Sequence, residues 1–219
     1  MKRIPEAELM TDEEQAIAYA NADFEEPHNH FIELLKESVG HVIPESGLAV
    51  DLGCGAADIS IRFAKVYSAY QIDALDGAEA MLAEGVKAVN TSGLTQRINL
   101  IHAYLQETTL ADRNYDLIFS NSLLHHLHDP MVLWNAIKSA KGDPSVFIMD
   151  LMRPGSDAEV DALTNKYAKD EPEVLQRDFH NSLKAAFTPD EVISQLSAVG
   201  LEGFNVLVVS DRHLTISSK

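Results

Sequence analysis

Short apolar runs alternate with amphipathic stretches through the middle of the chain. The apolar runs have the length of strands and lie at 48–52, 70–75, 98–103, 115–121 and 146–151. Between them, apolar residues recur at helical spacing over 59–67, 78–89 and 131–139. Buried strands that alternate with helices are typical of a parallel sheet covered on both faces, so the pattern predicts an α/β fold.

Two helices are predicted before the first strand. Thr11 and, three residues later, Glu14 have the spacing of a capping box, which predicts a helix over 11–19 with Thr11 as its N-cap. Pro27 suits a first helical position and precedes apolar residues at helical spacing. We therefore expect a second helix from Pro27 onward that buries Phe31, Leu34 and Leu35.

After the fifth apolar run the alternation pauses. The segments 158–168 and 174–187 are predicted as helices, and Thr188-Pro189-Asp190-Glu191 has the form of a further capping box. The stretches 204–209 and 213–216 are predicted as a strand pair that completes the sheet with an antiparallel edge. We expect a single domain over 1–219, with an N-terminal helical cap at 1–46 and a helical insertion at 155–187.

The composition disfavours some classes of binding partner and favours one cellular compartment. The net charge of −17 would repel nucleic acid, and no Lys/Arg stripe offsets it. No apolar stretch has the roughly 20 residues of a membrane span. The first residues do not read as a signal peptide, and the only cysteine, Cys54, has no cysteine partner. We expect a cytoplasmic protein without nucleic acid or membrane partners; the oligomeric state is not predicted.

A glycine loop follows the first strand. Asp51 ends that strand, and Gly53 and Gly55 follow before a helix, so the backbone there can approach a ligand closely. Asp76 ends the second strand, 21 residues after Gly55, where a carboxylate can accept both hydroxyls of a ribose. The alternatives are a simple tight turn for the glycines, a helix N-cap for Asp76 and a surface acid for Asp51.

Three motifs resemble class I S-adenosylmethionine (SAM)-dependent methyltransferases. The run Ala-Val-Asp-Leu-Gly-Cys-Gly at 49–55 resembles their glycine-rich motif, 75–82 resembles their second-strand acid with the helix after it, and 115–127 resembles their fourth strand. The segments 3–6, 179–183 and 211–214 resemble an uncharacterised branch of that superfamily. The resemblance implies a three-layer Rossmann-like methyltransferase fold, SAM as cofactor and S-adenosylhomocysteine (SAH) as product.

The same resemblance implies a cofactor site. Two positions depart from the family pattern: Ala57 stands at the third glycine, and Ala103-Tyr104-Leu105 stands where the family often has an acid for the adenine amine. Adenine contact is then expected through backbone groups and the Tyr104 ring. Tyr19 is expected to close over the cofactor. The predicted cofactor-binding residues are Asp51, Gly53, Cys54, Gly55, Asp76, Gly77, Tyr104, Leu105, Asn121 and Tyr19.

Two histidines follow the fourth strand, where the reactive end of a bound cofactor would emerge. His125 and His126 are candidate catalytic residues; each could act as a general base, line the acceptor pocket or serve only structure. Cys54 has no base beside it in sequence and reads as a passive small residue. His28 and His30 differ by two and would face different sides of a helix, so no metal site is predicted.

The segment around the insertion offers candidate contacts to the acceptor. We expect Asp150, Arg153 and His180 to meet it, with the acceptor between the N-terminal helices and the insertion. The alternative for Arg153 is an ion pair with Asp178 that holds the insertion down.

The predicted function is SAM-dependent methyl transfer to an unidentified, small-molecule acceptor by direct in-line displacement. Positioning two reactants can supply on the order of 7 to 11 kcal/mol, so a dedicated base is optional. Two alternatives stay open: a SAM-binding sensor or partner protein without transferase activity, and a dinucleotide-dependent oxidoreductase. Asp58 disfavours the second, since it occupies the third glycine position of a pyrophosphate-binding loop.

Overall fold

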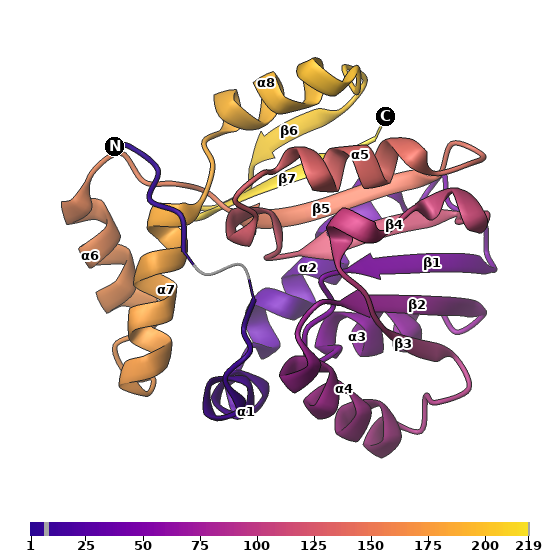
Figure 1. Ribbon diagram of the computed structural model, residues 1–219, viewed down its shortest axis with the longest axis horizontal. Helices are drawn as coiled ribbons and strands as arrows, with labels where there is room; N and C mark the ends of the chain where they lie inside the picture. The colour runs from indigo at the N-terminus through magenta and orange to yellow at the C-terminus, as the bar shows by residue number, and fades with distance from the viewer. Residues whose placement is uncertain (7–8, 219) are drawn as a thin grey trace.

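The computed structural model describes residues 1–6 and 9–218. Within them, seven strands form one sheet in the order β3-β2-β1-β4-β5-β7-β6 (Figure 1). The strands from β3 to β5 in this order are parallel, whereas β7 runs antiparallel to both β5 and β6. The predicted fold class, with its antiparallel C-terminal edge, is confirmed. The strands are β1 (Gly47–Leu52), β2 (Tyr70–Asp76), β3 (Ile98–His102), β4 (Leu117–Asn121), β5 (Ser145–Leu151), β6 (Asn205–Val208) and β7 (His213–Ser217).

Helices cover both faces of this sheet, and the alternation of side chains along each strand decides which residues meet them. Ala49 and Phe119 pack into one apolar cluster with α2, α3 and α4, while Val50 and Ile118 pack into a second cluster with α5 and α8. The result is three layers. The covering helices are α2 (Glu25–Val39), α3 (Asp58–Val66), α4 (Glu79–Ser92), α5 (Met131–Ser139) and α8 (Pro189–Val199).

The strand order reverses between β1 and β4. From β1 the chain builds outward to β2 and β3, and from β4 it builds outward on the other side to β5. At such a switch point the loops after the two central strands diverge, which leaves a crevice at their carboxyl ends. The fold therefore places the glycine loop after β1 and the histidines after β4 beside the same crevice.

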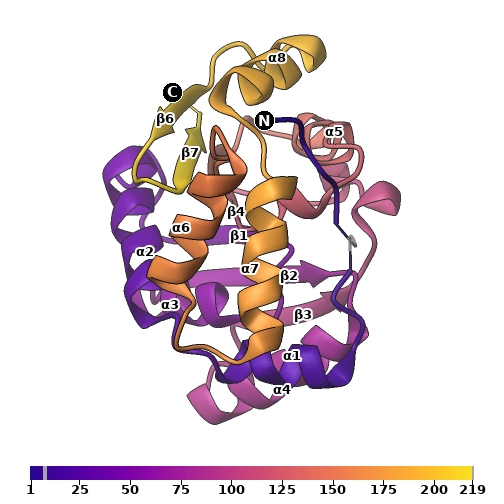
Figure 2. The same ribbon diagram turned by 90° about the vertical axis from the view of Figure 1, so that its left-hand side faces the viewer.

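Three further helices lie at this end of the sheet. They are α1 (Glu13–Asn21), α6 (Asp157–Tyr167) and α7 (Glu173–Ala185). Figure 1 shows the arrow of β1 pointing toward them, and Figure 2 shows α6 and α7 crossing in front of the strands with α1 below. Helices α1 and α7 are joined where the Gln15 Nε2 donates to Asp178 Oδ2 at 2.6 Å.

The first six residues are fixed along α7 and the turn after β4. The Ile4 N–H donates to the Lys184 carbonyl at 3.0 Å. The Arg3 guanidinium donates to the Ala185 carbonyl and to the carbonyls of His125 and Leu127, the last two at 2.9 and 2.8 Å. We call residues 1–6 the N-terminal strap.

Two predicted helix starts are wrong, and a third is confirmed. The N-cap of α1 is Asp12, not Thr11, because the Asp12 carboxylate accepts the Gln15 N–H. Helix α2 begins at Glu25, so Pro27 lies inside its first turn rather than at its first position. The capping box at Thr188 is present, with the reciprocal bonds between Thr188 and Glu191 both formed. Among the described residues, no helix is long and apolar enough to cross a membrane.

Candidate functional site

A cavity of about 1440 Å³ opens at the carboxyl ends of β1, β2 and β4. Its walls come from the glycine loop, the turn after β4, the N-terminal strap, α1, the start of α2 and α7. The volume exceeds the roughly 300–1,000 Å³ of an ordinary ligand pocket, because the hollow also extends along α3 and α4.

The glycine loop forms the floor of this cavity. Gly53 and Gly55 have φ of 72° and 53°, in the left-handed region that favours glycine. The N–H groups of Gly53 and Cys54 both donate to the Leu75 carbonyl, at 2.8 and 2.9 Å, which ties the loop to the end of β2. A Cβ on Gly53 would lie 2.7 Å from Leu123 Cδ1, so the protein itself requires glycine there.

Asp51 is buried beneath the loop. Its carboxylate accepts the Ser60 hydroxyl at 2.6 Å. Burial raises the pKa of Asp51 to about 7, against the opposing effect of that hydrogen bond and with a smaller contribution from the Asp76 charge. Ionising a buried carboxylate without a partner is unfavourable. Asp51 therefore favours the binding of a cation in the cavity.

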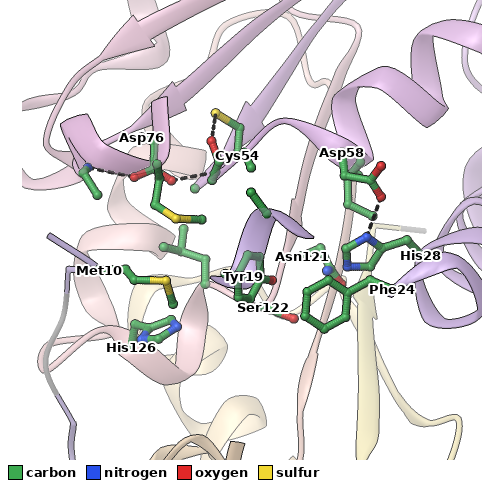
Figure 3. Close-up of a pocket in the computed structure, with 18 of the residues that line it drawn as sticks. Met10, Tyr19, Phe24, His28, Cys54, Asp58, Asp76, Asn121, Ser122 and His126 are labelled. Atoms are coloured by element: carbon green, nitrogen blue, oxygen red, sulfur yellow. Dashed lines mark hydrogen bonds and ion pairs between the residues drawn. The ribbon is translucent and has the colours of Figure 1, made fainter. Parts of the chain in front are cut away.

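Asp76 lies at the end of β2 and organises the loop from the other side. One carboxylate oxygen accepts the Gly55 N–H at 2.7 Å, and the other accepts the Ala78 N–H at 2.8 Å. Burial raises the pKa of Asp76, and the hydrogen bonds from Ala78 and Gly55 partly oppose that rise. An ionised carboxylate has about four lone-pair sites, so acceptor capacity remains beyond the bonds from Gly55 and Ala78. Asp76 and the Cys54 loop lie at the same end of the cavity (Figure 3).

The segment after β3 continues the wall beyond Asp76. Gly77, Ala103, Tyr104 and Leu105 all line the cavity. Tyr104 is 42% exposed, and a Cβ on Gly77 would lie 3.2 Å from its Cδ1. A flat apolar group next to Asp76 would therefore meet the Tyr104 ring.

Cys54 also lines the cavity, but its thiol is buried. Burial raises the pKa of Cys54 well above its usual value, and the negative charges of Asp51 and Asp76 add to the rise. A thiol kept protonated is a poor nucleophile, which agrees with a passive packing role.

An aromatic row from α1 and α2 forms the opposite wall. The rings of Tyr19 and Phe24 lie 4.7 Å apart, and Phe24 stacks on His28 at 5.1 Å. His28 Nδ1 in turn lies 2.6 Å from the Asp58 carboxylate (Figure 3). Burial, and then the negative charges of Asp58, Asp76 and Asp150, raise the pKa of Tyr19 to about 12, so its phenol stays protonated.

The turn after β4 contributes Asn121, Ser122, His125 and His126 to the cavity. Ser122 has a φ of 57°, a strained value for a residue with a side chain. The Asn121 side-chain oxygen is buried and has no hydrogen-bond partner among the described residues. An unsatisfied buried acceptor at this position calls for a donor from a ligand.

His125 is buried and 2% exposed. Its Nδ1 lies 2.6 Å from Asp150 Oδ1, while Asp150 Oδ2 accepts the Leu124 N–H at 2.7 Å. Burial alone would lower the pKa of His125, but the Asp150 charge and hydrogen bond, together with Glu6, outweigh it and raise that pKa. Glu6 of the N-terminal strap lies 3.7 Å from His125 Nε2 and 3.4 Å from His126 Nδ1.

The three predicted acceptor contacts do not line the cavity. Asp150 is buried behind His125, which it orients. Arg153 is also buried and bonds to Glu191 at 2.5 Å and to the Ala186 carbonyl at 2.9 Å, so the alternative of an ion pair with Asp178 is wrong as well. His180 of α7 is paired with Asp161 of α6 at 3.1 Å.

Sequence reasoning missed several residues of the cavity. Glu6 entered the sequence analysis only as part of the segment 3–6 and was not predicted to line the site. Phe24, His28 and Asp58 were not predicted to line it either. The histidine at 28 and the acid at 58 come from different helices, so no spacing in the sequence links them. The predicted cofactor-binding residues, by contrast, all line one cavity.

Comparison with known proteins agrees with this arrangement. Residues 49–141 match the family model of the methyltransferase domain. No curated protein matches the chain.

Solved structures share the fold. A SAM-dependent methyltransferase from Aquifex aeolicus superposes with a TM-score of 0.67 at 19% identity, covering 94% of this chain and 97% of that one. A proposed SAM-dependent methyltransferase from Methanococcus maripaludis gives 0.73 at 20% identity, covering 99% and 97%. The plantazolicin methyltransferase BpumL, solved with a triazolic desmethylPZN analog and SAH, gives 0.70 at 13% identity, covering 95% and 92%.

Proposed function

We propose that this chain, whose residues 49–141 match the methyltransferase domain, is a class I SAM-dependent methyltransferase that moves the methyl group of SAM to a small organic acceptor held in the same cavity. The observation that carries the proposal is the cavity itself. It joins the glycine loop and Asp76 to further space beside them, lined by the strap, α1 and α7.

The residues at the switch point suit SAM. The left-handed glycines let the backbone approach a ligand, and Asp76 has lone pairs left for the two ribose hydroxyls. Asp51, buried and hard to ionise alone, would be stabilised by the positive charges of SAM. The unsatisfied Asn121 oxygen would accept a hydrogen bond from the amino-acid end or the adenine of the cofactor.

SAM supplies, when bound, a methyl group on a positively charged sulfur that a lone pair can attack in line. The protein's part is to orient the acceptor, exclude water and remove any proton that the acceptor must lose. Holding two reactants in line can lower the barrier by on the order of 7 to 11 kcal/mol. The enclosing segments are therefore expected to contribute more than any single side chain.

The acceptor is proposed to lie between the N-terminal segments and α7. Tyr19 and Phe24 line one side of this space, and Leu175 and Phe179 line the other. The bond from Gln15 to Asp178 joins the two sides over the opening. The net charge of −17 disfavours nucleic acid as the acceptor.

His125 and His126 are the proposed catalytic residues, because both line the cavity on the side away from Asp76. Asp150 is reassigned from acceptor contact to a positioning residue that fixes the His125 ring. Tyr19 is proposed to close over the cofactor, since its protonated phenol lies in the aromatic wall.

Calorimetric titration tests the proposal. We expect SAM and SAH each to bind at one site per chain, and NADH not to bind. SAH release is then followed across phenols, carboxylic acids, amines and thiols incubated with SAM. Absence of SAM and SAH binding at millimolar concentration would overturn the proposal, while binding without turnover of any acceptor would favour a sensor.

A further inference from the structure

Three potential metal ligands from two distant parts of the chain meet in the cavity wall. They are Glu6 of the N-terminal strap and the neighbouring His125 and His126 after β4. One ligand atom from each lies within 4.8 Å of the other two. The Glu6 carboxylate is 3.7 Å from His125 Nε2 and 3.4 Å from His126 Nδ1.

His125 is oriented as a metal-binding histidine is. Its Nδ1 faces Asp150 at 2.6 Å, which leaves Nε2 directed toward Glu6. Asp150 is itself fixed by the N–H groups of Leu124 and Leu151, both at 2.7 Å. A carboxylate behind the far nitrogen is the usual partner of a histidine that ligates a metal, because it fixes the ring and strengthens the ligand nitrogen.

Glu6 is held in place just as firmly. Its carboxylate accepts the Ser182 hydroxyl at 2.8 Å, and its backbone carbonyl accepts from His128 Nε2 at 2.6 Å. Arg3 fixes the strap to the same turn that carries the histidines. The carboxylate therefore does not lie beside the histidines by the chance position of a mobile end.

We propose that Glu6, His125 and His126 bind one divalent transition-metal ion. An ion with tetrahedral ligands at about 2.1 Å holds neighbouring ligand atoms about 3.4 Å apart, close to the distances of 3.4 and 3.7 Å here. Two imidazoles and one carboxylate are a ligand set of Zn²⁺ enzymes and of Fe²⁺ enzymes. The set supplies three ligands and leaves the remaining positions facing the cavity.

The position suggests what the ion does. All three ligands line the cavity that is proposed to hold the acceptor, so this part of the inference rests on the proposed function. An acceptor hydroxyl or thiol that binds the ion would lose its proton to solvent more readily and present its lone pair to the methyl carbon. The two histidines would then activate the acceptor through the ion instead of taking the proton themselves.

Sequence spacing did not predict this site. Only His125 and His126 are neighbours, and two adjacent residues rarely bind one ion in regular secondary structure. They do so here because they lie in the short 3-10 turn Leu124–His126, where both side chains reach the strap. Glu6 joins them only through the folded strap, more than a hundred residues away in the chain.

Metal binding can be measured without knowing the acceptor. The full chain, stripped of metal, is titrated with Zn²⁺ in competition with a chromophoric chelator, and separately with Co²⁺ while its visible ligand-field absorption is recorded. We expect one ion per chain. Glu6→Gln and His126→Gln should weaken Zn²⁺ by more than about 100-fold, and Asp150→Asn by about 10- to 100-fold.

The matched control is His30→Gln, which removes another histidine paired with a carboxylate, Glu33, on the exposed face of α2. It should leave the Zn²⁺ affinity unchanged. Circular dichroism checks that each variant is folded, and the Glu6 and His126 variants change partly exposed side chains, so either one suffices. Zn²⁺ binding that is absent, or equal in the wild type and both ligand variants, overturns the inference.

SAH is titrated into the same samples. SAH binding without Zn²⁺ binding refutes the metal site alone, and Zn²⁺ binding without SAH binding refutes the proposed function alone.

Discussion

Replacement of Asp76 by alanine perturbs the cofactor site most directly. The substitution removes a carboxylate that accepts the N–H groups of Gly55 and Ala78 and that is proposed to accept both ribose hydroxyls. Hydrogen bonds to a charged group contribute about 1.5 to 3 kcal/mol. We expect SAH to bind roughly 10- to 150-fold more weakly to Asp76→Ala.

A second ligand distinguishes the two roles of the Asp76 carboxylate, which are holding the glycine loop and accepting the ribose hydroxyls. Loss of the bonds to Gly55 and Ala78 could disturb the loop and weaken SAH without any contact to ribose. SAH and its 2′-deoxy analogue are therefore titrated calorimetrically into the wild type and Asp76→Ala. The deoxy analogue should bind more weakly than SAH to the wild type, but as well as SAH to the variant.

The control variant is Asp116→Ala. Asp116 also accepts a backbone N–H, that of Leu48 at 2.8 Å, but at the opposite end of β1. It should leave SAH affinity unchanged. Should the missing hydroxyl weaken binding equally in the wild type and Asp76→Ala, the carboxylate only shapes the loop, and its assignment as ribose ligand is wrong.

Three further outcomes follow from the geometry. Because burial raises the pKa of Asp51 to about 7, ionisation of this carboxylate accompanies binding of a cation, and SAH should bind roughly tenfold more weakly at pH 6 than at pH 7.5 by calorimetry. Residues 11–30 and 170–187 enclose the acceptor space, so their amide hydrogens should exchange more slowly with SAH bound. Arg153→Met should lower the free energy of unfolding by about 1.5 to 3 kcal/mol in urea titrations, through the lost bond to Glu191, and leave SAH affinity unchanged.

Each of these can fail separately. An SAH affinity that is flat between pH 6 and 7.5, or equally pH-dependent in Asp51→Asn, would remove Asp51 from cofactor binding. Unchanged exchange in both segments would mean that α1 and α7 only thicken the core. A loss of SAH affinity in folded Arg153→Met would show that Arg153 acts on the site from outside the cavity.

The parallel sheet and the cofactor loop were predictable because their signals are local. The loop requires a strand, an acid, two glycines and a helix in this order. Residues 47–66 contain all of them in that order. The Thr188 capping box was equally readable. The start of α1 was not, since Thr11-x-x-Glu14 and Asp12-x-x-Gln15 offer caps one residue apart and only the folded backbone selects Asp12.

The contacts between distant segments could not be predicted. Arg153 had several acidic candidates in the chain, and the backbone pairing of Met152 and Arg153 with Phe187, just before α8, places Glu191 beside it. Glu6 reaches His125 only because Arg3 and Ser182 fix the strap. Such pairings depend on side-chain geometry across the whole fold, which a periodic pattern does not encode.

A crystal structure of the protein with SAH tests the central claim most directly. We expect SAH in the cavity at β1 and β4, with both ribose hydroxyls on Asp76, the ring of Tyr104 beside the adenine, and the sulfur directed toward the space bounded by His126 and Tyr19. SAH bound with its ribose away from Asp76, or with its sulfur directed away from that space, would contradict it.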